Sequence, residues 1–228
     1  MNHRVLPAGD SAWLVELPER IDPAVNARAV EIARLVERSP LPVEDVVVGY
    51  RSVMVYVDPL APAADEVEAV LQRIAASAAG DGDVAGAERD VPVCYEGDYA
   101  PDLPDVAAFA GCSRDEVIAR HLARQYRVYV VGFVPGFAYM ASVDPSIAAP
   151  RRASPRLKVP PGSVGIAAGQ TGIYPAATPG GWHLVGRCPT RPYDPLRAEP
   201  FLFRPGDRVR FQRISEAEYR AATEWGDA

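Results

Sequence analysis

The stretch SVGIAAGQTGIYPAATPGGWHLVGR, residues 163–187, alternates short apolar segments with glycine- and proline-rich turn signals. The same alternation returns in PFLFRPGDRVRFQRI, residues 200–214. Short apolar segments separated by turn signals are typical of β-barrels and β-sandwiches. We therefore predict a mostly-β domain in the second half of the chain.

The first eighty residues have a different pattern. IDPAVNARAVEIARLVER, residues 21–38, places a capping Asp22 and then Pro23 before apolar residues at helical spacing, and residues 64–78 repeat that spacing. SAWLVEL and EDVVVGYRSVMVYVD are strand-like, the second with a hairpin expected across Gly49–Ser52. We expect an α+β domain with two helices on one face of an antiparallel sheet.

Between the two patterns lies AGDGDVAGAER, which is small, polar and without periodicity. Such composition favours a linker. The expected organisation is an N-terminal α+β domain at 1–80, a linker at 81–90 and the mostly-β domain at 91–228.

Composition excludes several classes of function. The net charge of −6 argues against a nucleic-acid partner. Cys94, Cys112 and Cys188 are widely spaced and the three histidines are scattered, so we expect neither a disulfide framework nor a metal site. The start, MNHRVLPAGDSAWLVEL, has no basic segment followed by an apolar core. We therefore expect a cytoplasmic protein without a membrane-spanning segment.

The stretch GQTGIYPAATPGGW, residues 169–182, concentrates groups that can contact a small polar ligand. Gln170, Thr171, Tyr174 and Trp182 offer an amide, a hydroxyl, a phenol and an indole N–H among four glycines. The alternative is that the glycines and prolines form tight turns while the aromatic rings fill one end of a barrel. Phosphate-loop, dinucleotide-binding and nucleophile-elbow motifs are absent from the sequence.

Positive charge is concentrated in PRRASPRLKVPPGS, residues 150–163, although the protein as a whole is acidic. Such a cluster can clamp a carboxylate or phosphate, or it can form weak surface salt bridges. Arg187 has the same two interpretations. The four cations of the cluster are Arg151, Arg152, Arg156 and Lys158.

Two further features have a functional and a structural interpretation. In GFVPGFAYM, residues 132–140, Phe133, Phe137 and Tyr139 alternate toward one side, as a pocket wall or, more commonly, as core. His121 lies on the apolar face of an expected helix, where a histidine is more often a packing residue than a catalyst.

These segments resemble the 5-oxoprolinase subunit PxpB family, also called KipI or allophanate hydrolase subunit 1. The resemblance is carried by HLARQYRVYVVGFVPGFAYM, PRLKVPPGSVGIAAGQTGIYPAATPGGWHLVGRCP and GYRSVMVYVD, and it extends over nearly the whole chain. It implies that the mostly-β domain is a cyclophilin-like barrel. It also implies a PxpC- or KipA-like partner subunit and a PxpA-like third protein. Together these open the lactam of 5-oxoproline to glutamate, with ATP as a co-substrate and no covalently bound cofactor.

The resemblance further implies which residues form the site. It does not assign the catalytic group, for which His121, Gln170, Thr171 and Tyr174 are the candidates. The substrate-binding candidates are Phe137, Tyr139, Arg156, Lys158, Gly180, Gly181, Trp182 and Arg187, with Gly136 beside them. Cys188-Pro189 departs from the Thr-Pro expected there.

For 5-oxoproline, Arg156, Lys158 or Arg187 is expected to hold the carboxylate. Gln170, Thr171 and Tyr174 are expected to address the lactam, and N–H groups near Gly180 and Gly181 to stabilise an oxyanion. We expect the chain to be inactive without its partners. Two alternatives stay open: a KipI-type inhibitor of a sensor histidine kinase, and a subunit of a carboxyltransferase that processes urea or allophanate.

Overall fold

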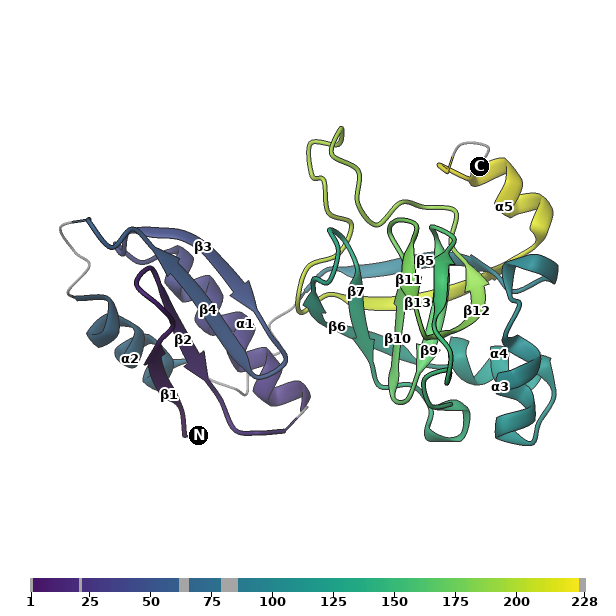
Figure 1. The fold of residues 1–228 in the computed structure, drawn as a ribbon, viewed down its shortest axis with the longest axis horizontal. Helices are drawn as coiled ribbons and strands as arrows, with labels where there is room; N and C mark the ends of the chain where they lie inside the picture. The colour runs from purple at the N-terminus through teal and green to yellow at the C-terminus, as the bar shows by residue number, and fades with distance from the viewer. Residues whose placement is uncertain (1, 21, 62–65, 79–85, 226–228) are drawn as a thin grey trace. The chain divides into compact units, whose positions relative to one another are not determined.

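The computed structural model describes residues 2–20, 22–61, 66–78 and 86–225. The chain divides into two compact units, Met1–Ala85 and Gly86–Ala228 (Figure 1). The first is α+β and the second contains a closed β-barrel, so the fold class expected from the sequence is confirmed.

The first unit is a four-stranded antiparallel sheet, in the order β1-β2-β4-β3, with both helices on one face (Figure 1). Helix α1 begins as predicted, because the Asp22 carboxylate accepts the N–H groups of Ala24 and Val25. The predicted hairpin joins β3 to β4, where the Gly49 N–H bonds to the Ser52 carbonyl at 2.8 Å. The elements are β1 (Arg4–Pro7), β2 (Ala12–Glu16), α1 (Pro23–Glu37), β3 (Val43–Val48), β4 (Ser52–Val57) and α2 (Val67–Ser77).

The second unit is a closed barrel in the order β10-β7-β6-β13-β5-β12-β9 (Figure 1). Its strands are β5 (Glu88–Cys94), β6 (Gln125–Val131), β7 (Ala138–Ala141), β9 (Ser163–Ala167), β10 (Gln170–Ile173), β12 (His183–Arg187) and β13 (Arg208–Ile214). Strand β5 begins at Glu88, inside the stretch 81–90 that we expected to be linker; residues 81–85 of that stretch lie outside the described residues.

The remaining elements of this unit surround the barrel. A separate two-stranded ribbon is formed by β8 (Arg156–Val159) and β11 (Thr178–Gly180). The helices are η2 (Gly97–Tyr99), α3 (Leu103–Ala110), α4 (Arg114–Leu122), η3 (Pro145–Ile147) and α5 (Glu216–Ala222). The Ser113 hydroxyl caps α4 at the Glu116 N–H, and the Glu116 carboxylate accepts a hydrogen bond from Arg120 one turn later.

Two apolar clusters lie on opposite sides of the barrel wall. Along β7, Ala138 and Met140 belong to the core inside the barrel. Phe137 and Tyr139 belong to a second cluster, which also contains Val159 of the ribbon. Because successive side chains of a strand point to opposite faces, this second cluster lies on the outer wall, beneath the ribbon.

Position 136 requires glycine because of its backbone conformation and because Tyr193 lies against it. Its φ is 86°, and a Cβ added there would lie 2.6 Å from the Cβ of Tyr193. We expect Gly136→Ala to lower the free energy of unfolding by about 2–3 kcal/mol, from left-handed strain and overlap together. Gly111, with φ 62° and no atom within 4 Å of an added Cβ, is the matched control. Gly111→Ala should cost about 1–2 kcal/mol in urea unfolding, because it adds the strain alone; equal losses would contradict the role of Tyr193.

Candidate functional site

Four predicted site residues meet in an aromatic cluster on the outer wall of the barrel. The Phe137 ring lies at its centre, with centroids 4.7 Å from Tyr139, 5.1 Å from Tyr174 and 5.4 Å from Trp182. The ring planes meet at 60–81°, the edge-to-face arrangement that aromatic pairs prefer. Phe137, Tyr174 and Trp182 are buried and Tyr139 is half-buried, so Tyr139 is the ring that a ligand can reach most directly.

Phe133 does not extend this aromatic row as the sequence suggested. It is 64% exposed and adopts a left-handed φ of 70°, in the turn that precedes β7. Its ring touches the cluster only at the edge of Phe137, with centroids 5.9 Å apart. The segment VPGF is a turn, so the alternation expected of a strand does not apply to Phe133, and its ring points outward.

The ribbon strand β11 packs directly on Tyr174. A Cβ at Gly180 would lie 2.5 Å from the Tyr174 hydroxyl oxygen, so only glycine permits this contact. Burial raises the pKa of Tyr174 to about 12, although a backbone hydrogen bond from Trp182 opposes that rise. Tyr174 therefore stays protonated near neutral pH, and its role in this cluster is to support the ribbon.

Asp102, immediately before α3, forms a buried charge cluster with the ribbon. Arg156 donates two hydrogen bonds to its carboxylate, at 2.7 and 2.8 Å, and Arg152 donates a third at 2.9 Å. The backbone N–H of Leu184 on β12 donates a fourth at 2.7 Å. Burial opposes ionisation of Asp102, but these four donors outweigh it and hold its pKa below the usual range.

This arrangement changes the role expected of Arg156. Its guanidinium is bound in bidentate fashion to an internal carboxylate, so it anchors the ribbon to the barrel and is not available as the anion clamp we predicted. Sequence reasoning missed Asp102, since Asp-Leu-Pro at a helix start resembles an ordinary N-cap. The Asp102 side chain in fact makes no capping bond to α3.

His121 and Thr171 lie inside the barrel, away from the aromatic cluster. The two ring nitrogens of His121 hydrogen-bond to Tyr95 at 2.9 Å and to Thr171 at 3.0 Å, and its ring stacks on Phe211. Burial lowers the pKa of His121 to about 3. This neutral, fully bonded imidazole is a packing residue, and the structure does not bring it to a surface where it could act on a ligand.

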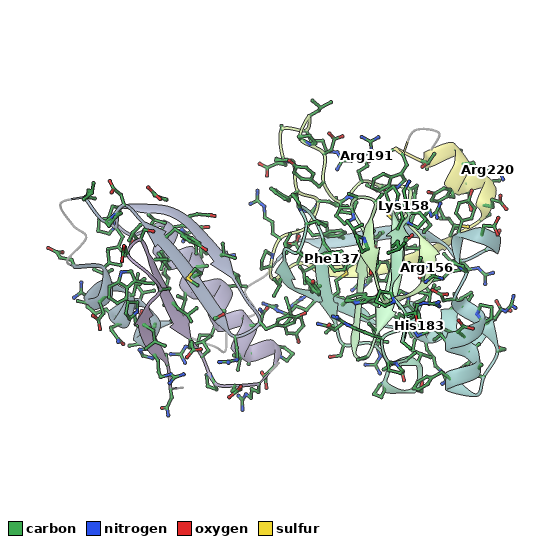
Figure 2. All side chains as sticks on the ribbon, in the orientation of Figure 1. Phe137, Arg156, Lys158, His183, Arg191 and Arg220 are labelled. Atoms are coloured by element: carbon green, nitrogen blue, oxygen red, sulfur yellow. The ribbon has the colours of Figure 1, made fainter. Side chains whose placement is uncertain are left out.

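Two predicted cations lie apart from the Asp102 cluster. Arg187 is at the opposite end of β12 from Trp182, with its guanidinium 5.4 Å from the centre of the Tyr99 ring. Lys158 is exposed on β8, two residues after Arg156 (Figure 2). Within the described parts of the chain, the Lys158 side chain makes no ion pair or hydrogen bond.

The residues around Asp102 do not favour a metal ion. Donor atoms of Asp102, Asp105 and His183 lie within 4.8 Å of one another, a set found among the described residues. Asp102 already binds Arg152 and Arg156, whose positive charges repel a cation.

All three cysteines are unpaired, and burial raises the pKa of the Cys188 thiol to about 12.

Comparison with known proteins shows which family this chain is similar to. Residues 3–203 match the family described as carboxyltransferase domain, subdomain C and D. The 5-oxoprolinase B subunit of Bacillus subtilis (strain 168) is 37% identical over 235 residues, covering 98% of each chain. Within the described residues, no helix has the length and apolar character needed to cross a membrane.

Two solved structures share the fold. That of TTHA0988 is 36% identical, with a TM-score of 0.80 over 90% of this chain, which spans only 40% of the length of that protein. The urea amidolyase of K. lactis has a TM-score of 0.75 at 21% identity, over 96% of this chain and 15% of that enzyme. At that identity the second likeness shows the fold alone.

Proposed function

The chain belongs to the carboxyltransferase domain, subdomain C and D, family, and from this premise we propose that it is the PxpB-type subunit of an ATP-dependent 5-oxoprolinase. The observation that carries the proposal is the likeness to a 5-oxoprolinase B subunit along 98% of both chains. The aromatic cluster supports it, together with the positive charge of Arg151 acting on Tyr139, because a small ring that carries a carboxylate needs an apolar surface and a positive counter-charge.

The proposed reaction breaks the lactam C–N bond of 5-oxoproline. Water supplies the oxygen of the new carboxylate, the ring nitrogen takes up protons to become the amino group of glutamate, and ATP hydrolysis to ADP and phosphate drives the opening. The chain has no phosphate-loop motif, so a PxpC- or KipA-like subunit and a PxpA-like protein are proposed to complete the ATP site.

Reconstitution tests this proposal. We expect the purified chain alone to show no ATP hydrolysis that depends on 5-oxoproline, and the complex with both partner proteins to release phosphate and glutamate in equal amounts. Urea and allophanate are the comparison substrates. Stimulation by either of these and not by 5-oxoproline would assign the chain to the related carboxyltransferase function, and robust activity of the chain alone would refute the need for partners.

A further inference from the structure

The four cations of residues 150–158 differ in what they contact. Arg152 and Arg156 are held by Asp102. Arg151 is exposed and, within the described parts of the chain, forms neither an ion pair nor a hydrogen bond through its side chain. A guanidinium without an internal partner can bind an external anion at a lower cost than one that must first leave a buried carboxylate.

The backbone on either side of Arg151 is fixed at two points. The Ala149 carbonyl accepts the Ala168 N–H at 2.6 Å, in the turn between β9 and β10. The Arg152 N–H donates to the Gly181 carbonyl at 2.8 Å, next to Trp182. Arg151 therefore lies on a short bridge between the turn that leads into Gln170 and the chain segment that leads into Trp182.

Tyr139 and Gln170 lie on the same outer face of the barrel at this bridge. Gln170 pairs with Ala141, and Ala141 shares its face of β7 with Tyr139 two residues earlier. The Tyr139 and Trp182 ring centroids are 5.9 Å apart. Burial raises the pKa of the Tyr139 phenol, and the positive charge of Arg151 opposes that rise, as expected for a guanidinium close to the ring.

We propose that Arg151 binds the carboxylate of the substrate, with Gln170 beside the lactam and the Tyr139 edge of the aromatic cluster against the ring. The ligand class is a small cyclic amide with one carboxylate. Guanidinium and carboxylate match in bidentate geometry, and a primary amide can both donate to a lactam oxygen and accept from a lactam N–H. This inference rests on the proposed function, and it assigns the carboxylate to Arg151 in place of Arg156, Lys158 or Arg187.

The test compares Arg151→Gln with the wild-type chain in the reconstituted complex. We expect the KM for 5-oxoproline to rise about 10- to 100-fold, because a charge-assisted contact to the carboxylate is lost. Arg151→Lys should recover part of that loss. Arg114→Gln removes an exposed guanidinium on α4 and should leave KM unchanged. Binding of 2-pyrrolidinone, which has the lactam but no carboxylate, should be equally weak in the wild type and in Arg151→Gln.

The outcomes separate this inference from the proposed function. If the complex opens 5-oxoproline and Arg151→Gln leaves KM unchanged, or if Lys158→Gln raises KM in its place, the Arg151 assignment is wrong while the function stands. If the complex does not open 5-oxoproline, the proposed function is wrong. Calorimetric titration of the full chain with 5-oxoproline then tests whether Arg151 binds the carboxylate. Wild-type binding that Arg151→Gln weakens tenfold supports the assignment, and absent or equal binding overturns it.

Discussion

Replacing Asp102 with alanine is expected to lower the free energy of unfolding of the barrel unit by about 3–5 kcal/mol. The change leaves the guanidinium groups of Arg152 and Arg156 without their shared carboxylate, and it leaves the Leu184 N–H without an acceptor. Removing the buried partner of this cluster costs more than the ion pairs themselves contribute, because two half-buried guanidinium groups lose their counter-charge. Urea unfolding followed by tryptophan fluorescence measures the loss.

Asp105 is the matched control for this prediction. It lies on α3, 3.7 Å from Arg152, but its side chain is 60% exposed. Exposed ion pairs contribute little, so Asp105→Ala should change the free energy of unfolding by about 1 kcal/mol or less. If the two alanine variants were equally stable, the buried carboxylate would not be what fastens the ribbon of β8 and β11 to the barrel.

The Asp102 cluster also shows where sequence reasoning stops. Asp102 and Arg156 are separated by 54 residues, and nothing in the local sequence around either residue indicates that the two side chains pair. Hydrophobic periodicity predicted the strands and helices that bring them together, because it reports which face of an element is buried. It carries no information on which charged side chains meet once those faces are packed.

Gln170 and Thr171 illustrate a second limit. They are neighbours in the sequence, and the motif predicts that both belong to one site. In a strand, adjacent side chains point to opposite faces, so Thr171 points into the barrel toward His121 while Gln170 lies on the outer wall. Strand alternation, applied to this motif as it is to the core, places Gln170 and Thr171 on opposite faces from the sequence alone.

The aromatic part of the site was more accessible to prediction. Phe137, Tyr139, Tyr174 and Trp182 were all selected from the sequence, and all four pack into one cluster. Large rings that alternate on strands or follow tight glycine turns are expected to pack together beneath a covering segment. Whether such a cluster is a core or the wall of a site depends on what lies at its edge, which only the folded chain specifies.

Acidification is expected to unfold the protein through His121. The folded state holds this imidazole neutral with a pKa of about 3, whereas the unfolded chain protonates it near its ordinary value of about 6.5. Between these values the unfolded state binds the extra proton, so stability is present above about pH 6.5 and is lost as the pH falls. The loss should be about 2 kcal/mol between pH 7 and pH 5, and about 4 kcal/mol by pH 3.

The window from pH 7 to pH 5 isolates this effect from the carboxylates. The pKa values of Asp102 and Asp144 are held below their usual range, so their contribution is lost only at lower pH. His121→Gln keeps a donor and an acceptor near Tyr95 and Thr171 but cannot titrate, and it should be less stable than the wild type at pH 7. Its stability should nonetheless fall by about 2 kcal/mol less between pH 7 and pH 5. Parallel urea-unfolding profiles for the two proteins would mean that His121 is accessible to protons in the folded state, and that its burial in the barrel does not govern the acid response.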